Sequence, residues 1–307
     1  MSEHSHGPRS DTRRDQRRLL IALAITALMT VAELIGGILS NSLALLGDAG
    51  HMFTDTLALS LSFFAIGLAR RPADTKRTFG YLRAEILAAL LNGAVLVGIA
   101  GFIFYEAYRR FNDPPKIEGG LMLAIAAVGL AANLAGIFFL RSAGRQNLNV
   151  KGAFLHVVSD ALSSIGVIAA AGIILTTGWN YADPLISILI GTLILRGAIQ
   201  LVWESVNILL EAAPRHLDAS RITAEIGKVP GVRDIHDIHI WTLTSGVHAM
   251  SGHLLIEDQM VSHSAQIIAE VNQKLAQDFG IAHTTLQIEC EVCQDHPVCQ
   301  IENSRRQ

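Results

Sequence analysis

Six long apolar stretches set the limits on what this chain can fold into. A helix needs about 20 mostly apolar residues to cross the core of a bilayer. Stretches of this kind lie at 19–40, 45–69, 84–107, 119–140, 153–176 and 184–203. Only 17% of the residues are charged, which is fewer than a soluble globular chain usually carries. The sequence therefore predicts an α-helical membrane protein with six transmembrane helices in the lipid bilayer.

The loops between these stretches differ in their content of Lys and Arg. On the side of the two termini lie Arg9, Arg13, Arg14, Arg17, Arg18, Arg70, Arg71, Lys76, Arg77, Arg83, Arg141, Arg145 and Lys151. On the other side lie Arg109, Arg110 and Lys116. Because cytoplasmic loops carry the excess of basic residues, we expect both termini in the cytoplasm. We expect a multi-pass protein of the inner (cytoplasmic) membrane, with residues 1–18 as a cytoplasmic tail rather than a cleaved signal peptide.

The remainder of the chain has the pattern of a small cytoplasmic α+β domain. Helical patterns lie at 218–229 and 262–279, and alternating patterns predict strands at 232–243, 247–257 and 284–290. This αββαβ order is typical of an open sheet with helices on one face. The domain boundaries predicted from these patterns are 19–212 for the transmembrane part, 213–291 for the cytoplasmic domain and 292–307 for a tail that contains Cys and His.

Ionisable residues inside the apolar stretches are the first functional candidates, because charge is costly in a membrane. The element His-x-x-x-Asp occurs twice, as His51 with Asp55 and as His156 with Asp160. Residues four apart share one face of a helix. Two such faces would supply two imidazoles and two carboxylates, a tetrahedral set that suits zinc. Asp48 lies on the face of His51, either as a relay residue or as a carboxylate at the helix entry.

Three further polar residues lie inside the apolar stretches. For Glu33, Asn92 and Asn133 we expect hydrogen bonds between helices rather than metal ligation.

Several segments carry a resemblance to a known family. GDAGHMFTD, LHVVSD, FGYLRAE and HDIHIW are similar to the zinc-exporting branch of the cation diffusion facilitators. The resemblance implies a transport site at His51, Asp55, His156 and Asp160. It also implies a homodimer with its cytoplasmic domains side by side, and an exchange of metal for protons.

The cytoplasmic domain is rich in histidine. By strict alternation His236 shares a face with Ile238 and Ile240, and His239 shares the other face with Trp241. The family resemblance implies metal ligands at His236, His253 and Glu289, with His239 and His283 nearby. Gln287 stands where some members of the family have a histidine. The alternative is that these histidines are solvated surface residues.

The tails and loops contain further candidate residues. Cys290 and Cys293 have the spacing of metal ligands, and His4 and His6 are candidates to complete their site or to form a loose metal-collecting tail. The loop after the second stretch contains no histidine, so a loop metal site of some family members is not expected at Asp74. The family pairs a basic residue at the position of Arg83 with an acid, here Glu211; the alternative for Arg83 is a basic anchor at the membrane.

The most consistent function is secondary active export of a divalent metal in exchange for protons. Imidazole binds metal only when it is neutral, so metal and protons compete for a site that contains histidine. Zn²⁺ is the favoured ion, with Cd²⁺, Co²⁺ and Ni²⁺ as alternatives. The rival interpretations are a membrane metal sensor without transport and an intramembrane metalloenzyme. The sequence has no His-Glu-x-x-His motif, and a site with four ligands leaves no position for an activated water, so we expect no enzyme. We also expect no nucleic-acid partner.

Overall fold

The computed structural model describes residues 26–69, 71–143 and 148–290, and the chain divides into two compact units. The first unit contains residues 1–61 and 91–202, and the second contains residues 62–90 and 203–307. The predicted tails 1–18 and 292–307 lie outside the described residues.

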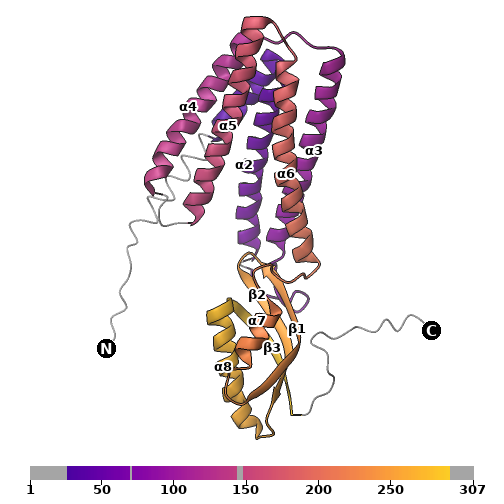
Figure 1. The fold of residues 1–307 in the computed structure, drawn as a ribbon, viewed down its shortest axis with the longest axis vertical. Coiled ribbons are helices and arrows are strands. Elements are labelled where there is room, and N and C mark those ends of the chain that lie inside the picture. Colours follow the sequence, from indigo (N-terminus) through magenta and orange to yellow (C-terminus); the bar gives the residue numbers. More distant parts are fainter. Residues whose placement is uncertain (1–25, 70, 144–147, 291–307) are drawn as a thin grey trace, which may run out of the picture. The chain divides into compact units, whose positions relative to one another are not determined.

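The N-terminal part of the chain consists of long helices (Figure 1). They are Thr26–Ser40, α2 Leu43–Ala69, α3 Ala84–Asn112, α4 Gly119–Ala143, α5 Leu148–Thr177 and α6 Ala182–Leu209. Among the described residues, Ala84–Asn112, Gly119–Phe138, Val157–Thr177 and Ala182–Leu209 are each long and apolar enough to cross a membrane, and Thr26–Ser40 is a shorter apolar helix. The predicted fold class is confirmed, with helices that extend a few residues beyond several of the predicted ranges.

Small residues allow the helices of the first unit to approach closely. Its buried core includes Ala44, Ala100, Ala126 and Ala170, none of them more than 1% exposed. In lipid, helices associate through such close packing because burial of apolar surface provides little drive there. Long apolar side chains such as Phe138 and Leu193 are exposed instead, as expected of surfaces that contact lipid.

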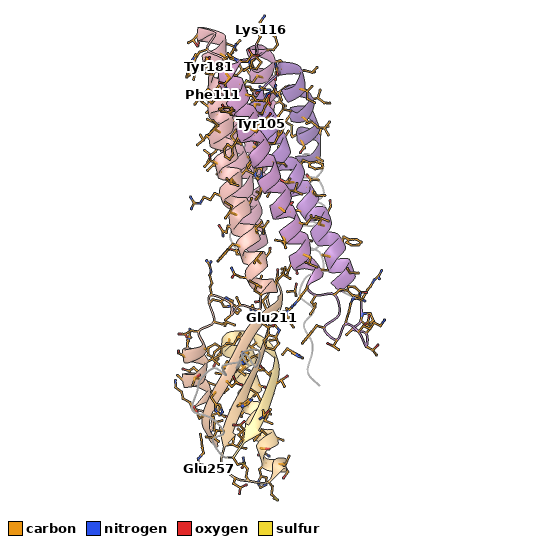
Figure 2. The ribbon with its side chains drawn as sticks, turned by 90° about the vertical axis from the view of Figure 1, so that its right-hand side faces the viewer. Tyr105, Phe111, Lys116, Tyr181, Glu211 and Glu257 are labelled. Carbon is orange, nitrogen blue, oxygen red and sulfur yellow. The ribbon has the colours of Figure 1, made fainter. Side chains whose placement is uncertain are left out.

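Aromatic side chains gather at one end of the helices in the first unit. The rings of Phe111 and Tyr181 stack with centroids 5.9 Å apart, and Trp179 lies 6.3 Å from Tyr181. Figure 2 shows Phe111 and Tyr181 at the same end of the bundle as Lys116. Aromatic residues with a polar group favour the membrane–water interface, so we expect this end of the helices to lie near one face of the bilayer.

The cytoplasmic domain, within the second unit, has the predicted αββαβ order. Its elements are α7 Ala219–Ile226, β1 Val232–Thr244, β2 Val247–Ile256, α8 Val261–Phe279 and β3 Ile281–Glu289. The sheet order is β1-β2-β3, with β1 antiparallel and β3 parallel to β2. Residues of α7 and α8 such as Ile222 and Leu275 pack against Met250 and Leu254 of the sheet, so both helices cover one face (Figure 1).

The predicted alternation along β1 is wrong because the strand contains a β-bulge. His236 pairs with His253 and His239 pairs with Ser251, so two residues of β1 stand opposite one residue of β2. Asp237, at this bulge, has a φ of 49°. Relative to strict alternation, the extra residue reverses the sides of the residues from His239 to Thr242, which pair without a break with β2. His236 therefore lies opposite in face to Ile240, and it shares its face with His239.

Candidate metal centres

The first element of the intramembrane constellation is formed within α2. Nε2 of His51 lies 3.5 Å from Oδ2 of Asp55, and the two side chains are 28% and 23% exposed. Their spacing of four residues places both on one face of the helix. The pair can therefore present an imidazole nitrogen and a carboxylate oxygen to the same ion.

The second element lies on α5. Asp160 is 4% exposed, which is unusual for a carboxylate in an apolar helix. His156 lies four residues earlier in α5, and its side chain lies outside the described part of the structure. Asp48 interacts electrostatically with His51 and Asp55 on its own helix and with Asp160 on α5. These interactions link the ionisable residues of the two helices within the first unit.

Asp48 is held by a residue that the sequence patterns did not single out. Asp48 is 2% exposed, and its Oδ1 accepts a hydrogen bond of 2.6 Å from the hydroxyl of Ser163 on α5. Ser163 follows the His-x-x-x-Asp element by three residues, which places it on the same face of α5 as Asp160. That spacing is the signal by which Ser163 could have been found.

Glu33 is a second residue that sequence reasoning undervalued. Its side chain is 1% exposed and interacts electrostatically with Asp48 and Asp160. Oε2 of Glu33 has no hydrogen-bond partner among the described residues, and neither has Oδ1 of Asn92. The predicted role in hydrogen bonds between helices is therefore not found for these two atoms, and Glu33 adds a buried carboxylate beside the constellation.

The start of α2 is fixed by a carboxylate from α6. Asp183, which is fully buried, accepts hydrogen bonds from Leu43 N at 2.9 Å and from Ala44 N at 3.1 Å. It also accepts a hydrogen bond of 2.6 Å from the hydroxyl of Ser42, which in turn accepts one from Leu45 N. The first amides of a helix have no partner within the helix, so these bonds determine where α2 begins.

An arginine completes this network. Nη1 of Arg110 on α3 lies 3.3 Å from Oδ2 of Asp183 and donates to the carbonyl of Asn41 at 2.6 Å. Its Nε lies 3.2 Å from Glu106. The buried negative charge of Asp183 is thereby compensated, and α2, α3 and α6 are tied together within the first unit. The sequence offered no local signal for this network because its members are far apart in the chain.

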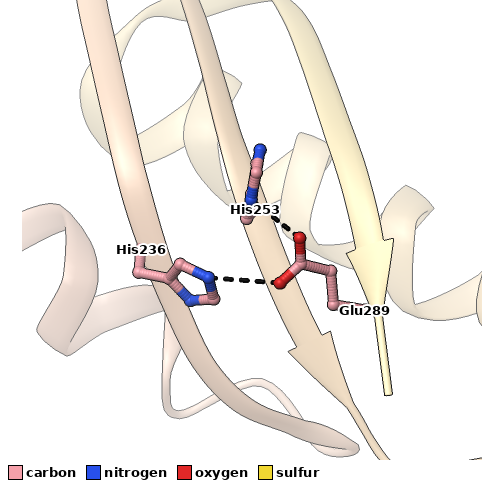
Figure 3. A group of neighbouring side chains, drawn as sticks. All are labelled: His236, His253 and Glu289. Atoms are coloured by element: carbon pink, nitrogen blue, oxygen red, sulfur yellow. Dashed lines mark ion pairs between the residues drawn. The ribbon is translucent and has the colours of Figure 1, made fainter. Parts of the chain in front are cut away.

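In the cytoplasmic domain, three of the predicted ligands meet (Figure 3). Nε2 of His236 lies 3.2 Å from Oε2 of Glu289, and Nδ1 of His253 lies 2.8 Å from Oε1 of Glu289. The three ligand atoms all lie within 4.8 Å of one another. Each strand of the sheet supplies one of the three residues. The strand pairing brings them together: His236 on β1 pairs with His253 on β2, and Glu289 on β3 pairs with Leu255, two residues after His253.

Two neighbours hold this group in place. Asp237, at the bulge, approaches Nε2 of His253 at 3.7 Å and Nε2 of His239 at 3.0 Å. The side-chain amide of Gln287 donates a hydrogen bond of 3.0 Å to Glu289. Two imidazoles and one carboxylate with supporting contacts are the donor set of a zinc site that keeps one position for a further ligand. The residues present therefore fit a bound divalent metal.

The other predicted cytoplasmic residues lie outside this group of ligand atoms. The side chain of His239 is 46% exposed, and its Nε2 contacts Oδ1 of Asp237. The ring of His283 makes an edge contact with Phe79, with centroids 5.4 Å apart. Cys290 is an exposed free thiol. Cys293 and the tail histidines His4 and His6 lie outside the described residues, so their composite site stays a prediction.

The loop between α2 and α3 uses its acidic residue for its own backbone. Asp74 accepts hydrogen bonds from the amides of Lys76 at 2.8 Å and Arg77 at 2.7 Å. The backbone amide of Arg77 is the main reason that the pKa of Asp74 is lowered. Asp74 thus stabilises a turn of the loop.

The predicted ion pair of the second unit is present. Nη2 of Arg83 lies 2.7 Å from Oε1 of Glu211. Both side chains are more than a third exposed, so the pair contributes at most about 1 kcal/mol.

Both parts of the chain match domains of known proteins. Residues 19–210 match the cation efflux transmembrane domain, and residues 214–291 match the cation efflux protein cytoplasmic domain. The chain is 45% identical over 290 residues to the metal cation efflux system protein CzcD of Cupriavidus metallidurans, covering 94% of this chain and 92% of that one. It is 43% identical to the cadmium, cobalt and zinc/H(+)-K(+) antiporter of Bacillus subtilis, covering 90% of each chain.

A third relative is named for a single metal. The chain is 42% identical to the zinc transporter ZitB of Escherichia coli, covering 97% of this chain and 93% of that one. These similarities extend through the constellation in α2 and α5 and through the cytoplasmic domain. The chain therefore belongs to the cation efflux family, the cation diffusion facilitators.

Proposed function

We propose that this multi-pass membrane protein exports divalent metal, zinc above all, from the cytoplasm in exchange for protons. The observation that carries the proposal is a set of ionisable residues inside apolar helices: Asp48 and Asp160 are buried, and His51 lies 3.5 Å from Asp55. Ionisable residues inside a membrane cost free energy, and they are therefore rare outside functional sites. Family membership and the names of the relatives, which are efflux proteins, antiporters and zinc transporters, support the same function.

The cargo ion would bind between α2 and α5. His51 and Asp55 supply one nitrogen and one oxygen, and His156 and Asp160 supply the same donors from α5. A divalent ion compensates the two carboxylates, which offsets the cost of their burial. Zinc accepts this tetrahedral set of nitrogen and oxygen donors, and cadmium, cobalt and nickel also bind imidazole and carboxylate.

Proton exchange follows from the chemistry of the same donors. The imidazole of histidine has a reference pKa of about 6.5 and must lose its proton before it binds metal. Metal that enters from the cytoplasm displaces protons, and protons from the other side displace metal. Alternating access of the helices to the two sides would then couple the two fluxes. Asp48, which accepts a hydrogen bond from Ser163, would pass protons to this site.

The cytoplasmic domain would act as a metal-binding regulatory and dimerisation domain of a homodimer. Its support is the meeting of His236, His253 and Glu289 in one group of ligand atoms. A metal held there would stabilise the domain by linkage, since it binds the folded state only. We propose domain limits at residues 19–212 and 213–291, an inner-membrane location, and both termini in the cytoplasm, as the distribution of basic residues indicates.

Flux measurements in sealed vesicles test the proposal directly. The purified full-length protein is reconstituted into proteoliposomes with a pH-sensitive dye inside, and zinc, cadmium, cobalt and nickel are added outside in turn. We expect metal uptake with proton movement in the opposite direction, greatest for zinc. Metal binding without flux would identify a membrane sensor instead, and flux without proton movement would refute the exchange mechanism.

A further inference from the structure

Two histidines outside the centres described above meet in the cytoplasmic domain. His216 lies in the segment that precedes α7, and His248 lies on β2. Their rings are in edge contact, with centroids 5.2 Å apart and an angle of 61° between the planes. His216 is exposed and His248 is half-buried, so the pair is open to solvent from one side.

This pair belongs to the other face of the sheet from the centre at Glu289. Side chains alternate along β2. His248, Ala249 and Met250 pair without a break with Thr242, Trp241 and Ile240 of β1, and Ala249 to Leu255 keep an unbroken register with β3. Because His248 has the parity of Met250 and Leu254, it shares their face, whereas His253 has the opposite parity. The pair therefore cannot contribute ligands to the group formed by His253 and Glu289.

A hydrogen bond orients the buried ring. Oγ1 of Thr242 lies 3.2 Å from Nδ1 of His248, and Thr242 is 6% exposed on the neighbouring strand. When Nδ1 donates its proton to this hydroxyl, Nε2 carries the free lone pair. Ligating histidines in metal sites generally have such a partner for the second nitrogen, because it fixes the tautomer and the direction of the ring.

The surroundings of His248 also favour its neutral form. Burial, and next the proximity of His216, lower the pKa of His248 below its ordinary value of 6.5. A neutral imidazole is the form that binds metal. The edge contact holds the two imidazole rings together, and no ion pair joins either ring to a carboxylate among the described contacts.

We propose that His216 and His248 form a second cytoplasmic metal site, with two imidazole ligands and with water in the remaining positions. Imidazole suits zinc, copper(II) and nickel, so the bound ion would be a divalent metal cation of this kind. With two protein ligands the site would bind more weakly than the group of three at Glu289. A bound ion would join the segment between α6 and α7 to β2. The cytoplasmic domain would then respond to the metal concentration at a second site.

Chemical modification of individual histidines tests this site in the full-length protein. Diethyl pyrocarbonate acylates accessible neutral imidazole nitrogens, and mass spectrometry of peptides gives the rate for each histidine. We titrate the detergent-solubilised protein with zinc, copper(II) or nickel up to millimolar concentration, and reverse the effect with a chelator. His263, an exposed histidine on α8, is the internal control. We expect metal to slow the acylation of His216 at least several-fold and to leave that of His263 unchanged.

Matched variants make the result decisive. In His248→Gln, which keeps a polar side chain beside Thr242, the protection of His216 by metal should disappear. In Thr242→Val, which keeps the shape of the side chain but removes the hydroxyl, protection should require about ten times more metal, in line with the effect of supporting contacts on metal affinity. The proposal is overturned if none of the three metals protects His216, or if protection persists undiminished in His248→Gln.

Discussion

Replacement of Asp183 by Ala should strongly destabilise the helical part of the protein. The Asp183 carboxylate is fully buried and accepts four polar contacts, from the hydroxyl of Ser42, the amides of Leu43 and Ala44, and the guanidinium of Arg110. Alanine offers none of these acceptors. The first turn of α2 would lose its cap, and Arg110 would lose its buried counter-charge.

The magnitude follows from the donors that are left behind. A buried donor without a partner costs about 1–3 kcal/mol, and loss of a helix cap costs about 0.5–2 kcal/mol. Breaking a buried ion pair costs about 3–5 kcal/mol, but Arg110 retains Asn41 and Glu106 as partners, which reduces this cost. We therefore expect a total loss of about 3–5 kcal/mol for Asp183→Ala, and about half of that for Asp183→Asn, whose amide oxygen still accepts.

Thermal unfolding of the detergent-solubilised protein measures this loss. The matched control is Asp113→Ala, which removes an exposed carboxylate that follows α3 and should leave the midpoint of unfolding unchanged. We expect Asp183→Ala to lower the midpoint by many degrees and Asp183→Asn to lie between it and the wild type. Equal midpoints for Asp183→Ala and Asp113→Ala would show that the carboxylate does not hold the start of α2.

Four other changes test the remaining conclusions. Asp160→Ala should abolish metal flux in proteoliposomes while the protein still inserts and purifies, and wild-type flux would contradict its assignment as a ligand. His51→Asp should keep flux but reduce discrimination between zinc and cadmium, and an unchanged ratio of the two rates would argue against ligation by His51. Glu289→Gln should remove most of the rise in unfolding temperature on zinc addition while flux falls only in part; a full zinc-dependent rise would refute its role. His248 has a lowered pKa when folded, so in chelator the unfolded chain takes up the proton first and stability should fall as the pH drops below 6.5; this fall should be smaller in His248→Gln, and identical pH profiles would contradict the argument.

The sequence by itself determined the class of the fold and the kinds of ligand. Six apolar stretches require a membrane because their length and composition match the bilayer core. The alternating and helical periods after residue 213 determined the αββαβ order, which the structure confirms. The repeated His-x-x-x-Asp element identified His51 and Asp55 as neighbours, because the spacing of residues on one helix is fixed by its period alone.

Only the tertiary structure decided which distant residues meet. Strict alternation placed His236 and His239 on opposite faces of β1, whereas the bulge at Asp237 places both on the face of His253. A bulge depends on pairing with the next strand, so the period of one strand cannot reveal it. The cap on α2 from Asp183 is undetectable in the sequence for a similar reason: a carboxylate satisfies the amides of a helix wherever the packing of the chain brings it, whatever the separation along the chain.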